Sequence, residues 1–294
     1  MLMKIKFLLQ RAAGYLAGFA IFYEPFMLFG RLTSGFFNET GFASLHVPCA
    51  RIPLANIVTG ELQGSGPTSL FFCLLLAVIS LWFGPLFCGR LCPAGAFGEL
   101  LSKALPPKYQ LDLARLLPLT PLRCGFFIGF LFSVWAGLGV PCAYCNYYAL
   151  ELFVGYLHTG VLFSTSLSLL ATFLLANVLL GLFTKGGRGY CNLLCPVGAF
   201  NSLCHVIGQQ LPGPFKMQVN KAKCVGCGKC AKACPMQAIK LDGRKTAIDI
   251  KHCIVMCFMV FGKDLMKLWI WFISIHFTGF LSHLDSAERH ECTF

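Results

Sequence analysis

Two stretches of the sequence carry pairs of thiols at the same spacing. They read FCGRLCPAGAF and YCNLLCPVGAF, so three residues separate Cys88 from Cys92, and three separate Cys191 from Cys195. This spacing places both thiols of a pair within one helical turn or one tight loop, where they face the same way. Because one pair supplies half of a four-thiolate site, we expect both pairs to converge and hold one 4Fe–4S cluster.

Two other uses of these pairs stay open at the level of sequence. Each loop could carry a redox-active dithiol of its own, or lend ligands to clusters held elsewhere in the chain. The residues that follow each pair predict its local shape. Pro93 and Pro196 predict a helix break after the second cysteine, and Gly95 and Gly198 allow the sharp turn expected next.

A third motif, KCVGCGKCAKACP, has the C-x2-C-x2-C-x3-C-P spacing of bacterial ferredoxins. It contains four cysteines, Cys224, Cys227, Cys230 and Cys234. Zinc sites more often use two separated CxxC pairs or histidines. We therefore predict at least one 4Fe–4S cluster here, with Gly226 and Gly228 at sharp backbone turns. The next segment, MQAIKLDGRKTAID, predicts a helix start, a strand, an Asp-Gly turn and a second strand.

The second motif of a two-cluster ferredoxin is incomplete. KHCIVMCFMVF supplies Cys253 and Cys257 but no third cysteine and no Cys-Pro. In two-cluster ferredoxins the fourth cysteine of one run ligates the other cluster, so the usual fourth ligand of the first cluster is missing. Cys253 and Cys257 are the predicted replacements, and Cys292 is a weaker candidate.

A further repeat surrounds a smaller set of thiols. The tetrapeptide VPCA occurs twice and contains Cys49 and Cys142, with Cys145 three residues beyond the second copy. Together with Cys73, these thiols predict either a weaker counterpart of the first site or a disulfide in an oxidising compartment.

The composition indicates which class of protein contains these motifs. Of the 294 residues, 56% are hydrophobic and 12% charged, with 17 cysteines and a mean hydropathy of +0.69. Soluble domains carry about 25% charged residues, so the composition predicts a membrane protein. Four apolar segments approach the ~20 residues that a span requires. They are residues 12–30, 69–87, 122–140 and 162–183.

The distribution of lysine and arginine predicts the orientation of these spans. The loop after the second segment holds five basic residues, and the loop after the third holds none. We therefore expect a multi-pass protein of the bacterial cytoplasmic (inner) membrane, with both termini cytoplasmic and the VPCA loops outside. The net charge of +12 is then mostly topological, and no basic–aromatic surface suggests nucleic acid.

The predicted fold is a mainly α membrane protein, a four-helix transmembrane bundle made of a duplicated two-helix unit, followed by a small α+β ferredoxin-like domain. The expected divisions are residues 1–206 for the bundle, 207–262 for the ferredoxin-like domain and 263–294 for a hydrophobic tail. The tail fits a membrane-lying segment, a fifth hydrophobic element or a shifted reading frame.

Glu24, in FAIFYEPFMLF, is an ionisable residue within the first predicted span. Such residues are functional candidates because burying a charge in a bilayer is costly. We predict Glu24 as a catalytic residue that accepts a proton from quinol. The alternative is that it reaches headgroup water at a helix end, with Pro25 marking a kink.

In combination, these motifs resemble the NapH-type membrane iron–sulfur proteins. Relatives of that family include the polyferredoxin portions of nitrous-oxide-reductase and methylamine-utilisation accessory proteins. The resemblance covers about residues 1–260. It implies cluster ligation by the CxxxCP cysteines and by the four ferredoxin cysteines, with electron transfer as the function.

Two functions remain to be separated. The preferred one is electron transfer between the quinol pool and a redox partner protein, by a chain that is itself surrounded by membrane lipid. The alternative is an accessory protein that reduces or delivers a metal during metalloenzyme assembly. Lys221, Lys223, Lys229 and Lys232 surround the ferredoxin motif. They would steer an acidic partner, or simply form a solvated face. No hydrolytic or transferase motif is present.

Overall fold

The computed structural model describes residues 2–23, 26–37, 49–61, 65–138, 142, 145–159, 171, 173–211, 224–228, 230–231, 234–242 and 245–249. The α-helices are α1 (Leu2–Phe22), α2 (Leu28–Phe37), α3 (Arg51–Thr59), α4 (Pro67–Phe83), α5 (Pro93–Ser102), α6 (Leu113–Leu116), α7 (Leu119–Trp135), α8 (Asn146–Thr159), α10 (Leu180–Leu182), α11 (Gly189–Leu193) and α12 (Pro196–Gln210). Two π-helical segments, η2 (Phe87–Leu91) and η4 (Phe173–Leu179), and a 3₁₀ turn, η3 (Pro107–Tyr109), complete the helical part. The strands are β1 (Ile239–Asp242) and β2 (Lys245–Ile248).

The expected four-helix transmembrane bundle is wrong. In the part of the chain that the structure describes, none of the helices combines the length and the apolar character needed to cross a membrane. The reason is local: α4 and α7 have 17 residues each, and the 21 residues of α1 include Lys4, Lys6 and Arg11. The predicted multi-pass placement in the bacterial cytoplasmic membrane, with both termini cytoplasmic, depended on those spans and is corrected by the same finding.

The helices end where the sequence interrupts them. Pro67 opens α4 after Gly66, and Gly84 closes it with a φ of 78°. Pro118 precedes α7, and Gly137, with a φ of 67°, lies two residues beyond its end. Proline at the first helical turn and glycine with a positive φ at the end are common limits of an α-helix. These stops divide the apolar runs into shorter helices.

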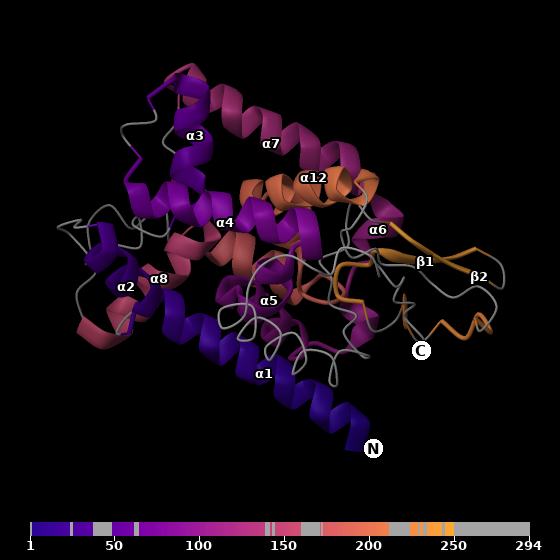
Figure 1. Ribbon diagram of the computed structural model, residues 1–294. Coiled ribbons are helices and arrows are strands. Elements are labelled where there is room, and N and C mark those ends of the chain that lie inside the picture. The colour runs from indigo at the N-terminus through magenta and orange to yellow at the C-terminus, as the bar shows by residue number, and fades with distance from the viewer. Residues whose placement is uncertain are drawn as a thin grey trace, which may run out of the picture.

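The helices are short and cross one another as they pack (Figure 1). Helix α12 packs against α4 and α7, and α3 contacts both α4 and α7. On the opposite side of the molecule α1 contacts η2 and α5, while α5 also packs on α10 and η4. The two strands form a separate hairpin at one end of the structure (Figure 1). The centre of the molecule is therefore enclosed by helices from both halves of the chain.

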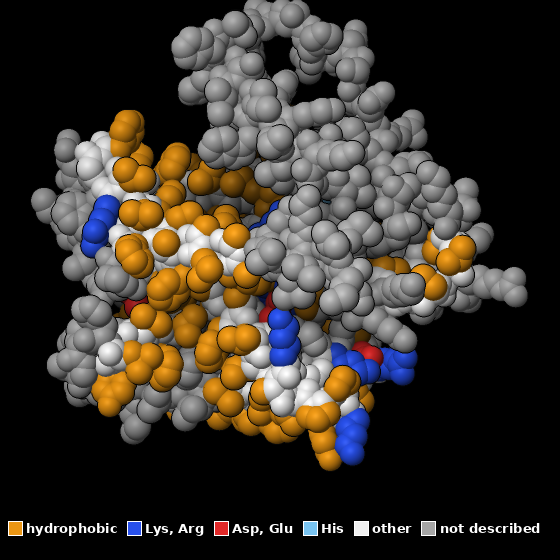
Figure 2. Space-filling view, turned by 90° about the horizontal axis from the view of Figure 1, so that it is seen from below, with side chains coloured by type: hydrophobic (Ala, Val, Ile, Leu, Met, Phe, Trp, Pro, Cys, Tyr) orange, Lys and Arg blue, Asp and Glu red, His pale blue; other side chains and the backbone are white. Residues whose placement is uncertain are grey.

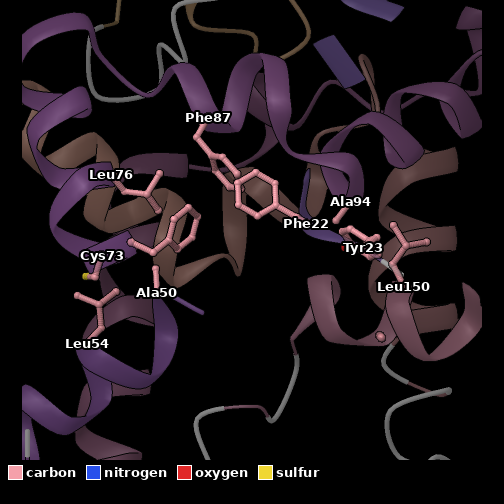
Figure 3. Close-up of a cluster of buried hydrophobic side chains, with 11 residues drawn as sticks. Phe22, Tyr23, Ala50, Leu54, Cys73, Leu76, Phe87, Ala94 and Leu150 are labelled. Carbon is pink, nitrogen blue, oxygen red and sulfur yellow. The ribbon is translucent and has the colours of Figure 1, made fainter. Parts of the chain in front are cut away.

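The core is rich in aromatic side chains (Figure 3). The rings of Phe22 and Phe87 meet edge to face with centroids 5.2 Å apart, and Phe72 approaches both rings at 5.3 and 5.5 Å. Aromatic pairs in these geometries add to the stabilisation that burial alone provides. The cluster joins α1, α4 and η2, and Cys88, Leu91 and Cys92 pack against it. The first cysteine pair is thus held by the core itself.

The described elements leave much apolar surface exposed. Leu32 and Phe36 on α2 are 75% and 82% exposed, and Leu16 on α1 is 71% exposed. Figure 2 shows hydrophobic side chains spread over much of one face, with few charged ones among them. Burial is therefore concentrated around the aromatic core.

The second cysteines of the two CxxxCP segments have nearly the same backbone conformation, as the sequence repeat suggests. Cys92 precedes α5 with φ −69° and ψ 108°, and Cys195 precedes α12 with φ −76° and ψ 109°. Pro93 and Pro196 occupy the first helical positions, where a missing N–H costs nothing. They therefore begin a new helix, and the expected turn at the following glycines is wrong because these glycines lie inside it.

The ferredoxin-like segment follows its predicted pattern where it is described. Gly226 and Gly228 have φ values of 70° and 68°, so both adopt the left-handed conformation that permits the expected sharp turns. Strands β1 and β2 pair antiparallel, with Asp242 opposite Lys245, which confirms the predicted hairpin. The division of the chain into three domains stays a prediction.

Candidate iron–sulfur site

A cavity lies at the centre of the molecule, beside the aromatic core. Its walls include Phe72 and Phe87 from the core and Tyr147 and Tyr190 from the second half of the chain. Six thiols also line it: Cys49, Cys88, Cys92, Cys145, Cys191 and Cys195. The structure therefore brings together the two CxxxC pairs, together with one thiol from the first VPCA loop and one from the segment after the second.

Each thiol of the two CxxxC pairs is positioned by a short local element. Cys88 lies in the π-helical segment η2, and Cys92 caps the N-terminus of α5. Cys191 lies in α11, and Cys195 caps the N-terminus of α12. In both halves the first thiol comes from a helical turn and the second from the entry to the next helix. The duplicated sequence thus supplies two similar halves of one site.

Several N–H groups point at these sulfur atoms. The Asn201 side-chain amide donates to Cys88 Sγ at 3.4 Å, and the backbone N–H of Gly198 donates to Cys195 Sγ at 3.4 Å. Donors in these positions stabilise negative charge on sulfur, which metal-bound thiolates carry.

Two buried arginines, which the sequence analysis missed, complete the surroundings of the four thiols. Arg188 Nη1 donates to the Cys88 carbonyl oxygen at 2.7 Å and lies 3.9 Å from Cys191 Sγ. A Cβ atom on Gly95 would lie 2.0 Å from Arg188 Nη1, and one on Gly198 would lie 2.8 Å from Arg123 Nη2. The glycines therefore make room for the two guanidinium groups. In the sequence, the sign that space is needed here was the glycine that both motifs share, Gly95 and Gly198, and it was interpreted as a turn.

Arg188 is held in place by a buried ion-pair network. Its Nε donates to Glu99 Oε1 at 2.7 Å, and Nη2 donates to the Tyr15 hydroxyl at 3.1 Å. Arg11 also contacts Glu99. A buried charge of this kind persists only when it is paired and hydrogen-bonded. The network thus fixes a positive charge next to the first cysteine pair.

Burial sets the protonation of the thiols in the metal-free protein. Burial raises the pKa of Cys88 and Cys92, and it raises the pKa of Cys195 to about 12. The neighbouring arginines act in the opposite direction but are outweighed. These three groups are therefore neutral thiols near pH 7, and binding iron would release their protons.

The ferredoxin motif lies directly against this site. Met236 and Ala238 are buried, and Cys234 packs around them together with Cys88 and Cys191. The Asn192 side-chain amide donates to the Met236 carbonyl oxygen at 3.5 Å.

Further contacts hold this segment in position. A Cβ atom on Gly186 would lie 2.4 Å from the Cα atom of Pro235. Gln237 accepts from the backbone N–H of Ala114 at 3.0 Å and donates to the carbonyl oxygen of Lys185 at 3.3 Å. The end of the ferredoxin motif is thus anchored to the loop that precedes α11.

The other described ferredoxin thiols differ in their surroundings. Cys227 is exposed. A hydrogen-bonding contact with the Thr246 hydroxyl, 3.3 Å from the sulfur, lowers the pKa of Cys224. Burial raises the pKa of Cys234, although backbone N–H groups after it act in the opposite direction. Cys224 and Cys227 therefore lie on the outer side of the motif and Cys234 on its inner side.

The residues around the cavity fit a four-iron cluster better than a single metal ion. Within the described ranges no three His, Cys, Asp or Glu side chains are arranged to hold one metal ion. In a 4Fe–4S cluster each thiolate binds a different iron, so the sulfur atoms stand farther apart than the ligands of one ion do. Four thiols around one cavity, with N–H donors and two buried arginines, meet that requirement.

Some predicted site residues are not part of this arrangement. Cys73 is buried in α4, where burial and, after it, the Cys204 thiol raise its pKa, and it does not line the cavity. Glu24, Cys253 and Cys257 lie outside the described residues. The roles of all predicted ligands, and of Glu24, stay predictions.

Two families match parts of this chain, and both are described as a 4Fe-4S binding domain. The first covers residues 217–240, which contain the ferredoxin motif. The second covers residues 65–111 and 165–213, and each of these two ranges contains one CxxxCP pair. The chain therefore carries 4Fe–4S binding domains at both of the positions where the thiols gather.

The chain is also similar to several characterised or named proteins. It is 30% identical over 184 residues to YccM of Escherichia coli, by its name a proposed electron transport protein, with 61% of this chain and 49% of YccM covered. It is 30% identical over 160 residues to MauN of Methylobacillus flagellatus, a methylamine utilization ferredoxin-type protein, covering 53% of this chain and 50% of MauN.

A third relative is the regulatory protein NosR of Pseudomonas aeruginosa, 29% identical over 190 residues, with 60% of this chain and 24% of NosR covered. The chain thus spans about half of YccM and about a quarter of NosR. No solved structure matches the chain. Membership of the NapH-type family in particular stays a prediction.

Proposed function

We propose that this protein transfers electrons between a quinol and a partner redox protein through two adjacent 4Fe–4S clusters. One cluster is held by the two CxxxC pairs, and the other by the ferredoxin motif. The single observation that carries the proposal is the packing of Cys88, Cys191 and Cys234 around Met236 and Ala238. Because thiols of both motifs share one small apolar contact, electrons would have a short route between the two sites.

The chain's own residues prepare the inner site for this task. A bound cluster would supply one-electron transfer. Arg188 and Arg123 place positive charge beside the thiolates, and the N–H donors of Gly198 and Asn201 stabilise the charge that accumulates on sulfur during reduction. Phe72 and Phe87 form an aromatic wall beside the thiols.

A quinol is the proposed electron donor because its oxidation releases as many electrons as two clusters accept. A quinol loses two electrons and two protons, and two 4Fe–4S clusters accept one electron each. The aromatic side chains next to the site suit contact with an apolar ring. Glu24 is the proposed proton acceptor, and the basic residues around the ferredoxin motif would steer an acidic partner.

The test is quinol-dependent reduction of the full chain, purified without oxygen. We expect a water-soluble quinol to bleach both clusters in the wild type. In Cys88→Ser the quinol should no longer reduce the ferredoxin cluster, whereas dithionite still should. Cys124→Ser, which changes an exposed thiol, is the control and should behave as wild type. Equal quinol rates in wild type and Cys88→Ser would refute the proposed route.

A further inference from the structure

Three thiols outside the four-cysteine site belong to the VPCA loops and the residues that follow them. Cys49 lies two residues before α3, and Cys145 directly precedes α8. Both line the central cavity. The backbone N–H of Cys145 donates to the Cys142 carbonyl oxygen at 3.1 Å, which keeps these two residues in one tight turn. The two loops were expected on the far side of a membrane, but Cys49 and Cys145 share the cavity of the CxxxC pairs, and the electrostatic influence of Cys142 on Cys49 places it nearby.

Nitrogen donors lie next to the sulfur atoms of Cys49 and Cys145, as they lie next to the thiols of the first site. Cys49 accepts hydrogen bonds from the backbone N–H groups of Arg51 and Ile52 at the start of α3. The Arg51 guanidinium, in a residue only 6% exposed, bonds to Cys145 and also lies near Cys195. A buried positive charge is stabilised by negative charge close to it, and iron-bound thiolates would supply that charge.

Tyr147 adds a polar group between the two sets of thiols. Its hydroxyl is fully buried and has no hydrogen-bond partner among the described residues. Tyr147 lines the cavity and lies within electrostatic reach of Cys49, Cys145 and Cys92. A buried hydroxyl without a partner is costly, so it indicates that a polar or charged group occupies the space beside it.

We propose that Cys49, Cys142 and Cys145 bind an additional 4Fe–4S cluster, next to the one on the CxxxC pairs. Three thiolates would bind three of its irons and leave the fourth iron with a ligand other than cysteine. Arg51 and the α3 N–H groups compensate its charge, and the Tyr147 hydroxyl donates a hydrogen bond to it. The proposal takes the iron–sulfur class from the proposed function but does not depend on quinol.

Iron and sulfide counting of the full chain, reconstituted anaerobically with ferrous iron and sulfide, tests this. At four irons per cluster, we expect about 12 irons per chain if this site exists in addition to the other two, and about 8 if it does not. Cys49→Ser and Cys145→Ser should each lose about four irons and one EPR signal. Cys124→Ser (exposed) and Cys204→Ser (buried outside the cavity) are the controls and should keep the full count.

The outcomes separate this site from the first one. Cys88→Ser should lose a different EPR signal from the one lost in Cys145→Ser. If Cys145→Ser loses iron while Cys88→Ser keeps it, the additional site stands and the proposed function fails. A wild-type count of about 8 at four irons per cluster, with no iron lost in Cys49→Ser or Cys145→Ser, would overturn the additional site. So would a Cys49–Cys145 disulfide found by mass spectrometry of the denatured, alkylated protein, even if the variants fail to fold.

Discussion

Among single residues, Glu99 carries the largest predicted effect on stability. It pairs with Arg188, whose side chain is 0% exposed, and also contacts Arg11 and Tyr15. Removing one partner of a buried pair leaves the other charge uncompensated, which costs ~3–5 kcal/mol. Glu99→Gln should therefore lower the free energy of unfolding of the metal-free protein by that amount in a urea titration.

A second carboxylate provides the matched control. Asp112 pairs with Lys185 at 3.3 Å, but the lysine side chain is 44% exposed. Exposed pairs contribute ~0–1 kcal/mol because water and salt screen them. Asp112→Asn should therefore change the unfolding free energy by less than ~1 kcal/mol, and an equal loss in both variants would contradict the assigned role of Glu99.

The cysteines of the site could be predicted from sequence, and its arginines could not. The C-x3-C-P pairs identify themselves by spacing, because thiols one turn apart face the same way. Arg188 lies three residues before Cys191 but belongs to no motif, and Arg123 reaches the site from α7. Their basic character was interpreted as a signal of topology instead.

Among the elements, the close approach of α5 to the loop before α11 is the most sensitive to an added methyl group. A Cβ atom on Gly98 would lie 2.4 Å from the Gly187 carbonyl oxygen, which is backbone and cannot move alone. Overpacking of this kind costs ~1–3 kcal/mol. Gly98→Ala should therefore lower the melting temperature of the metal-free protein, measured by circular dichroism.

Helix α7 offers the corresponding control. Gly125 lies within α7, and a Cβ atom there would meet nothing within 4 Å. Alanine in place of an unobstructed helical glycine stabilises by up to ~1 kcal/mol. Gly125→Ala should raise the melting temperature; a fall in both variants would show that packing around Gly98 is not the cause.

The sequence predicted helices at the positions of α1, α4 and α7 but misjudged their length. Apolar composition indicates where helices occur, whereas Pro67, Gly84 and Pro118 decide where they stop. The prediction continued the second span past Gly84 to residue 87 and the third past Trp135 to residue 140, and so counted more apolar residues than the helices contain. The strand pair was easier, because an Asp-Gly turn between two short β segments is a strong local signal.

For the whole molecule, burial of thiols predicts a loss of stability at high pH in the metal-free state. Burial raises the pKa of Cys73 from its ordinary value of 9.0 to about 11. A pKa raised by folding contributes stability that is present below about pH 9. It is lost as the pH rises from there toward about 11. Urea titrations at increasing pH should show this decline, and Cys73→Ala should make it shallower; an unchanged slope would contradict it.

The central cavity is the feature of the whole molecule that sequence could least anticipate. Its lining comes from both halves of the chain, and it unites thiols that the predicted topology had placed on opposite sides. Which loops meet depends on how short helices cross, and that depends on many small packing choices spread over the chain.

The division of the inner site between the two halves also has a consequence during synthesis. About a hundred residues separate Cys92 from Cys191. At ~5–20 residues per second, the ribosome needs roughly 5–20 s to add them. Throughout that interval the first two thiols have no partners with which to hold a cofactor. Cofactor delivery must therefore follow translation of the second half, and a nascent chain that stalled between the two motifs would expose oxidisable cysteines.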